Sequence, residues 1–173
     1  MGRLLGHFVL ACDRDDLGDG RMKLFIPGES GPRWEIPARG YGANGPGWWM
    51  TGGDTPPGRY RVGKIHPISA DDPQANAFGP YFLDLIELEG QEMRHGRAGI
   101  GIHGGGSGLA DPRAPFQGWK ITHGCVRVQN DHLLRVVNTV LWVRKQQSPR
   151  REWYDYSPEE NYVDFTMAWV DQL

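Results

Sequence analysis

The chain has 173 residues, with 19 lysines and arginines against 21 acidic residues. This near balance, without a basic run, argues against nucleic acid as a partner. The 25 glycines and 13 prolines disfavour long helices and favour a turn-rich fold built on strands. No apolar run approaches the roughly 18 residues that a membrane span needs, and two cysteines do not define a disulfide framework.

Short apolar stretches separated by turn signals predict strands in the first two-thirds of the chain. The segment 7–11 is predicted to be the first strand rather than part of an export signal, because its apolar run is short and is interrupted by Gly6 and His7. The glycine-dense segment 39–49 is expected to be a loop. Further strands are predicted at 22–26, 33–38, 58–65, 80–88 and 98–103.

The pattern changes after Cys125, where two helices are predicted. Asn130 can cap a helix whose apolar residues recur at helical spacing, namely Leu133, Leu134, Val137, Val140 and Leu141. A capping box predicts a second helix, formed by Ser157, Pro158 and Glu160 and followed by Tyr162, Phe165 and Trp169. We therefore expect a single, mainly β domain over residues 1–173, with two helices toward its C-terminus.

Cys125 lies in a setting that packing alone does not require. Gly124 before it permits a tight turn and leaves backbone amides open to a bound oxyanion. Arg127 lies two residues further on, on the same face if the segment is extended. A thiol nucleophile needs an oriented base, and His103 ends a strand at the start of a glycine-rich loop. Two alternatives stay open at this point: a packing cysteine, and a zinc site made of His103, His123 and Cys125.

Two motifs stand on either side of that loop. The motif IHGG at 102–105 is followed by THGCVRVQN at 122–130. This pair resembles the signature of the L,D-transpeptidase catalytic domain, also called the YkuD domain. The segments TPPGRYRV at 55–62 and AFGPYFLDL at 77–85 are similar to two further pieces of that family.

The resemblance covers residues 7–135, from the first strand into the helix capped by Asn130. It implies a YkuD-like fold, with a β-sandwich or mixed sheets and a glycine-rich catalytic loop. The loop at 104–121 is slightly longer than the family pattern and is the candidate for a lid that excludes water. Residues 146–173 match nothing in the family and are expected to form a helical extension.

The resemblance also implies a reaction on peptidoglycan stem peptides, without a cofactor or a metal. Cys125 would attack the carbonyl before the terminal D-alanine of a tetrapeptide, and His103 would take the thiol proton. The carbonyl of Gly104 would orient His103, and the amides of Gly124 and Cys125 would hold the oxyanion. The other expected site residues are His123 as a support, Arg127 as a carboxylate ligand or loop-fixing ion-pair partner, and Thr122 and Tyr81 in the substrate cleft.

The acyl acceptor and the biological role stay open at this stage. An amine acceptor gives a cross-link between stems, a free D-amino acid gives exchange, and water gives L,D-carboxypeptidase action. A secreted antibacterial effector that uses this chemistry on a competitor's cell wall is one alternative, and a non-catalytic wall-binding module is another. We expect a monomer that acts in the periplasm or the cell wall. Because the segment 7–11 is interpreted as a strand and not as an export signal, export by a dedicated secretion system is favoured.

Overall fold

The computed structural model describes residues 6–12, 20–90, 95–147 and 163–169. Its strands form one eight-stranded sheet in the order β3-β2-β1-β8-β4-β5-β6-β7. The helices are α1 (Ala75–Phe78) and α2 (Asn130–Gln147). The strands are β1 (Gly6–Cys12), β2 (Arg21–Phe25), β3 (Trp34–Pro37), β4 (Gly58–Pro67), β5 (Tyr81–Gly90), β6 (Gly101–His103), β7 (Val126–Arg127) and β8 (Val163–Trp169). This confirms the mainly β fold and each strand predicted before Cys125.

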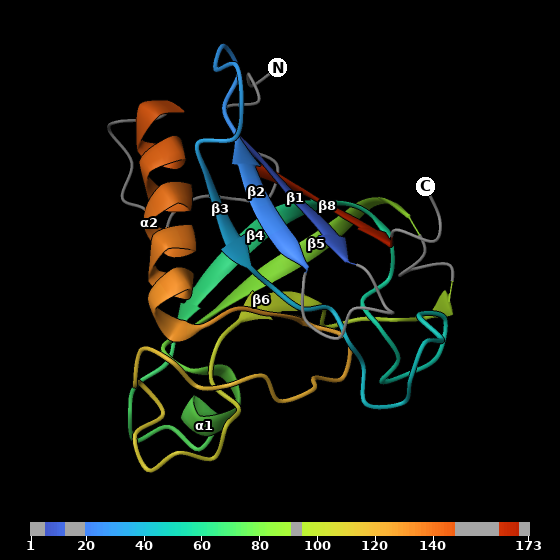
Figure 1. The fold of residues 1–173 in the computed structure, drawn as a ribbon, viewed down its shortest axis with the longest axis vertical. Coiled ribbons are helices and arrows are strands. Elements are labelled where there is room, and N and C mark those ends of the chain that lie inside the picture. The colour runs from blue at the N-terminus through green and yellow to red at the C-terminus, as the bar shows by residue number, and fades with distance from the viewer. Residues whose placement is uncertain (1–5, 13–19, 91–94, 148–162, 170–173) are drawn as a thin grey trace.

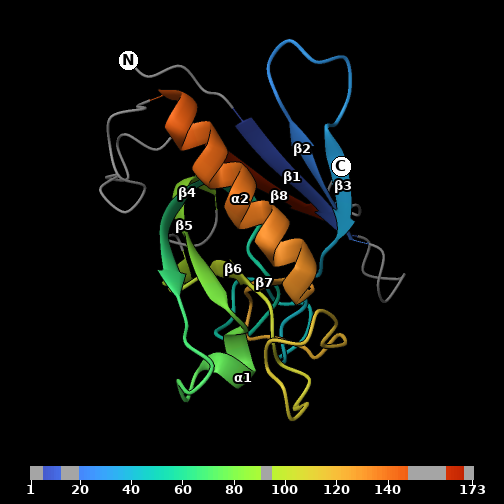
Figure 2. The same cartoon turned by 90° about the vertical axis from the view of Figure 1, so that its left-hand side faces the viewer.

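The core lies between the sheet and α2, which crosses one face of the sheet (Figures 1 and 2). The strands supply it with residues at every second position, as Met22 and Leu24 of β2 show. The predicted helix at Asn130 is confirmed, and its buried face consists of Leu133, Val136, Val137, Val140 and Val143. Among the described residues, no helix has both the length and the apolar character to cross a membrane.

The prediction of a second C-terminal helix was wrong for residues 163–169. This segment is strand β8, which lies parallel to β1 and antiparallel to β4 in the middle of the sheet. Val163, Phe165 and Met167 are buried at every second position. The spacing of four between Phe165 and Trp169 fits a helix, but it is also a multiple of two and therefore fits a strand equally well. The capping box at 157–160 lies outside the described residues.

The register of the last strands brings the motif at 102–105 next to the motif at 122–130. His103 in β6 lies opposite Phe82 of β5 on one side and Arg127 of β7 on the other. Directly paired residues point to the same face of a sheet, and so do residues two apart on one strand. His103, Arg127 and, by extension of β7, Cys125 therefore share one face. The connecting loops around them gather below the sheet in Figure 1.

Candidate active site

A cleft of about 1280 Å³ brings together most of the predicted site residues. Its lining includes His103, Thr122, His123, Cys125 and Arg127. Cys125 is partly exposed, and its thiol lies 3.5 Å from the carbonyl oxygen of Gly99, which it can reach as a hydrogen-bond donor. A partly exposed cysteine that opens into a cleft also lined by His103 is not a packing residue, so the structure argues against that alternative.

The imidazole of His103 is fixed from two directions. Its Nδ1 lies 2.8 Å from the carbonyl oxygen of Gly104, the contact that the sequence led us to expect. Since a carbonyl only accepts, Nδ1 carries the hydrogen, and Nε2 is the nitrogen that can take a proton. The ring of Phe82 stacks on the imidazole at 5.7 Å and 14°, and the ring of Phe78 meets it edge-on at 4.9 Å.

Burial keeps His103 neutral. Desolvation, together with the positive charge of Arg127, lowers the pKa of His103 to about 3, although the hydrogen bond to Gly104 acts in the opposite direction. Between about pH 3 and the ordinary value of 6.5, the unfolded chain therefore binds a proton that the folded chain does not. The contribution of His103 to folding stability falls as the pH drops through that window and is complete above it.

The turn that carries Cys125 is shaped by Thr122. The N–H of Gly124 donates to Oγ1 of Thr122 at 3.1 Å, and that hydroxyl lies 2.8 Å from the carbonyl oxygen of Cys125. Gly124 has a φ of +114°, a conformation that favours glycine. Its N–H is therefore used inside the turn, which corrects the expectation that this amide is open to an oxyanion. Thr122 therefore fixes the backbone around Cys125, and these contacts do not support a role in binding substrate.

Arg97 is a site residue that the sequence analysis did not identify. Its buried guanidinium donates to the carbonyl oxygens of Gly53 and His123, both at 3.2 Å, and to that of Asp54 at 3.1 Å. It lines the cleft beneath the cysteine turn, where a Cβ on Gly124 would lie 2.0 Å from its Nη2. Arg97 thus joins the loop before β4 to the turn at Cys125. No local pattern marks it, because all these partners are backbone groups distant in sequence.

Arg127 fixes the glycine-rich loop. Its Nε donates to the carbonyl oxygen of Lys120 at 2.7 Å, and Nη1 donates to that of Gly104 at 2.6 Å and to that of Gly105. The guanidinium is buried, and desolvation lowers the pKa of Arg127 to about 10 despite an opposing interaction with Cys125. These contacts support the loop-fixing role, through backbone carbonyls in place of the expected ion pair. They do not support a carboxylate ligand.

Replacing Arg127 with lysine is expected to lower the free energy of unfolding by about 2–3 kcal/mol, because hydrogen bonds to buried carbonyls are lost and a compact ammonium cannot span them. Chemical denaturation measures this. Arg135→Lys is the matched control, since Arg135 is exposed on α2 and should change stability by less than about 0.5 kcal/mol. Equal stability of the two variants would contradict the loop-fixing role of Arg127.

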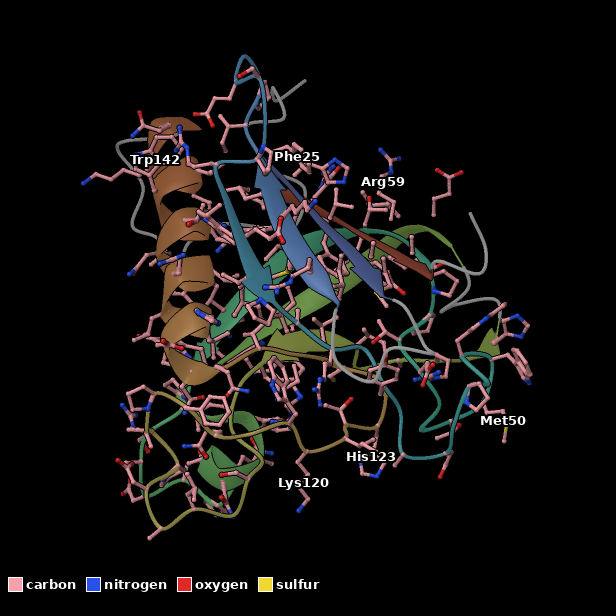
Figure 3. All side chains as sticks on the ribbon, viewed as in Figure 1. Phe25, Met50, Arg59, Lys120, His123 and Trp142 are labelled. Carbon is pink, nitrogen blue, oxygen red and sulfur yellow. The ribbon has the colours of Figure 1, made fainter. Side chains whose placement is uncertain are left out.

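The remaining predicted residues occupy different places. His123 is exposed at the rim of the cleft, Figure 3 shows it among the loops below the sheet, and its carbonyl is bound by Arg97. Tyr81 was expected in the substrate cleft but does not line it. Its side chain borders a separate hollow of about 190 Å³ and packs against the core. The reason is strand alternation: Tyr81 points away from the face that Phe82 shares with His103.

The loop at 104–121 is a fixed wall of the cleft. Asn130 at the start of α2 accepts from the N–H of Gly105 at 3.0 Å and donates to the carbonyl oxygens of Pro112 and Ala114. Gln117, which is buried, donates to the carbonyl oxygen of Asp111 at 3.0 Å. These side-chain bonds anchor the loop to the start of α2 and to itself, so they do not support the lid that the sequence suggested.

The cleft is also lined by a third histidine, His66. His66 of β4 lies opposite Phe82, the residue that stacks on His103, and it lines the cleft. Its Nε2 lies 2.8 Å from a carboxylate oxygen of Asp84. Within the described residues, no three His, Cys, Asp or Glu side chains are grouped as a metal ion would require.

Comparison with known proteins points to the same family as the two motifs. A family model described as the L,D-transpeptidase catalytic domain (YkuD) matches residues 19–164, further toward the C-terminus than the motifs reached. Curated protein sequences give no significant match. The Bd1075 protein of Bdellovibrio bacteriovorus has a similar fold, with a TM-score of 0.53 at 16% identity over 93% of this chain and 47% of that one. An L,D-transpeptidase from Mycobacterium tuberculosis aligns with a TM-score of 0.42 at 14% identity over 93% and 57%. The chain spans about half the length of these two proteins.

Proposed function

Because this chain belongs to the L,D-transpeptidase catalytic-domain (YkuD) family, we propose that it is a cysteine acyltransferase of peptidoglycan stem tetrapeptides, acting in the periplasm or the cell wall. One observation carries the proposal most strongly. Cys125 opens into the cleft that His103 also lines, and the bond to Gly104 leaves Nε2 of His103 to accept a proton. His103 ends β6, and Cys125 directly precedes β7, the strand that pairs with β6.

In the first half-reaction, the sulfur of Cys125 attacks the carbonyl carbon that precedes the terminal D-alanine, and Nε2 of His103 takes the thiol proton. The C–N bond then breaks, the departing amine receives that proton, and a thioester remains on Cys125. The low pKa of His103 makes its protonated form a strong acid, which suits delivery of the proton to the amine. The buried cation of Arg127 favours negative charge on the sulfur.

In the second half-reaction, we propose an amine of a second stem as the acceptor. The cleft of about 1280 Å³ exceeds the usual range of about 300–1000 Å³ for a site that takes one small ligand. A fixed loop wall leaves room for an acceptor as large as a peptide. The acceptor nitrogen attacks the thioester carbon and loses a proton to Nε2 of His103, and that proton passes to the sulfur of Cys125 as the C–S bond breaks.

Incubation with purified tetrapeptide muropeptides, with the products resolved by mass spectrometry, tests this proposal. We expect linked dimers together with free D-alanine. Tripeptides alone would show that water is the acceptor and would overturn the second half-reaction. Unchanged tetrapeptides, with binding that persists in Cys125→Ala, would instead support a non-catalytic wall-binding module.

The neutral state of His103 predicts how the thiol responds to pH. With the pKa of His103 at about 3, no imidazolium is present between pH 5 and pH 8 to stabilise a resting thiolate. Alkylation of Cys125 by iodoacetamide is therefore expected to keep rising with pH across this range. A rate that is already maximal at pH 5 would show a preformed ion pair and contradict the assignment. Alkylation measured in Cys125→Ser gives the background that the other cysteine, Cys12, contributes.

A further inference from the structure

The loop between β3 and β4 presents large apolar side chains to solvent beside the cleft. Trp49 is 52% exposed and Met50 is 47% exposed. We refer to Trp48, Trp49 and Met50 as the aromatic ledge. Exposed apolar groups that lie together on a surface mark sites of interaction. The run from Gly40 to Gly53 contains no charged side chain, so the ledge suits a neutral partner with apolar faces.

The ledge is held rigid. The ring of Trp48 meets that of Trp49 edge-on at 5.2 Å and that of His95 at 5.4 Å. The carbonyl of Trp48 accepts from Arg97 at 2.5 Å, which ties the ledge to the residue that also supports the cysteine turn. The N–H of Met50 donates to the carbonyl of Gly47 at 2.8 Å. Aromatic side chains held in this way lose little conformational entropy when a ligand binds.

The ledge continues directly into the cleft. Thr51 and Gly52 follow Met50 in the chain and line the cleft together with Asn44. Asn44 bonds back across the loop, since its side chain donates to the carbonyl oxygen of Thr51 at 2.7 Å. Gly42 and Gly53 lie backbone against backbone, where a Cβ on Gly42 would be 2.0 Å from the carbonyl carbon of Gly53. A ligand that fills the cleft and extends past Thr51 therefore meets the ledge.

We propose that the aromatic ledge binds the glycan strand to which the stem peptide is attached. This rests on the proposed function, because a stem bound at Cys125 must leave the cleft toward its sugar. Pyranose rings present flat, uncharged C–H faces that stack on indole rings, and their hydroxyl groups suit the polar side chains of Asn44 and Thr51 at the rim. The ledge would thus select polymeric wall over free peptides.

The test compares two substrates, a disaccharide tetrapeptide and the free tetrapeptide. Trp49→Ala is expected to raise KM for the disaccharide tetrapeptide about tenfold and to leave kcat/KM for the free tetrapeptide unchanged. Trp49→Phe should restore most of the loss. Trp142→Ala is the matched control, because Trp142 is 42% exposed on α2, and Figure 3 shows it far from Met50. Equal effects of Trp49→Ala on both substrates, or no effect on either, would overturn the proposal.

A second measurement separates this proposal from the proposed function. Binding of the full chain to glycan strands whose stems have been removed enzymatically requires no catalysis. We expect the unmodified chain to bind these strands and Trp49→Ala to bind about tenfold more weakly. If the unmodified chain fails to bind these strands, or if both chains bind equally well, glycan binding by the aromatic ledge is overturned even when tetrapeptides are turned over. If neither substrate is turned over but binding to the strands still depends on Trp49, only the proposed acyltransferase activity is overturned.

Discussion

Cys125→Ala is expected to abolish both turnover of stem tetrapeptides and covalent labelling by a carbapenem. Removing the nucleophile of a covalent mechanism lowers the rate by about 10⁴-fold or more, since only binding and polarisation of the substrate remain. A carbapenem added to the unmodified chain should increase the intact mass by one molecule of the drug, and the variant should keep its original mass. Mass spectrometry with peptide mapping locates the adduct.

The structure supports a clean interpretation of this variant. Cys125 is partly exposed, and its side chain faces the cleft, so its removal leaves the buried core intact. The midpoint temperature of thermal unfolding should therefore change by no more than a few degrees. Labelling that persists in Cys125→Ala, or activity within tenfold of the unmodified chain, would remove the assignment of this cysteine as the nucleophile.

His103→Gln is expected to slow formation of the thioester by about 10²–10⁴-fold, which is the usual contribution of general acid–base catalysis. Glutamine can still donate toward the carbonyl of Gly104, but it has no nitrogen that takes up a proton at neutral pH. Single-turnover acylation with a tetrapeptide donor measures this step separately from the transfer that follows.

His123→Gln is the matched control for this experiment. His123 is exposed at the rim, and Arg97 holds it through its backbone carbonyl, a bond that the substitution leaves in place. We therefore expect a change of only a few-fold. An equal loss in the two variants, or a larger one in His123→Gln, would show that the base has been assigned to the wrong histidine.

Local sequence patterns were sufficient where short-range rules decide the structure. Alternation in β2 and β4, and helical spacing after Asn130, placed these elements correctly. The motifs around His103 and Cys125 were brought together because β6 and β7 pair in register. The motif also anticipated the contact between His103 and the carbonyl of Gly104.

Sequence patterns failed where the structure depends on pairing between segments that are far apart in the chain. The central strand β8 is defined by its partners β1 and β4, and its own residues satisfy helical and strand spacing alike. Arg97 and His66 reach the cleft only through the folded chain, since their partners lie elsewhere in the sequence. Tyr81 was misplaced because the face of a strand depends on its register. The amide of Gly124 was assigned to an oxyanion because its bond to Thr122 is visible only in three dimensions.

The most direct measurement is the intact mass of the protein, quenched in acid within the first turnovers of a purified tetrapeptide donor. If a sulfur-bound acyl group is the intermediate, the mass rises by that of the donor minus alanine, and mapping places the increase on Cys125. Free D-alanine should appear in equal amount in the same sample. Release of D-alanine with an adduct on another residue, or with Cys125 bearing none at any quench time, would contradict the account.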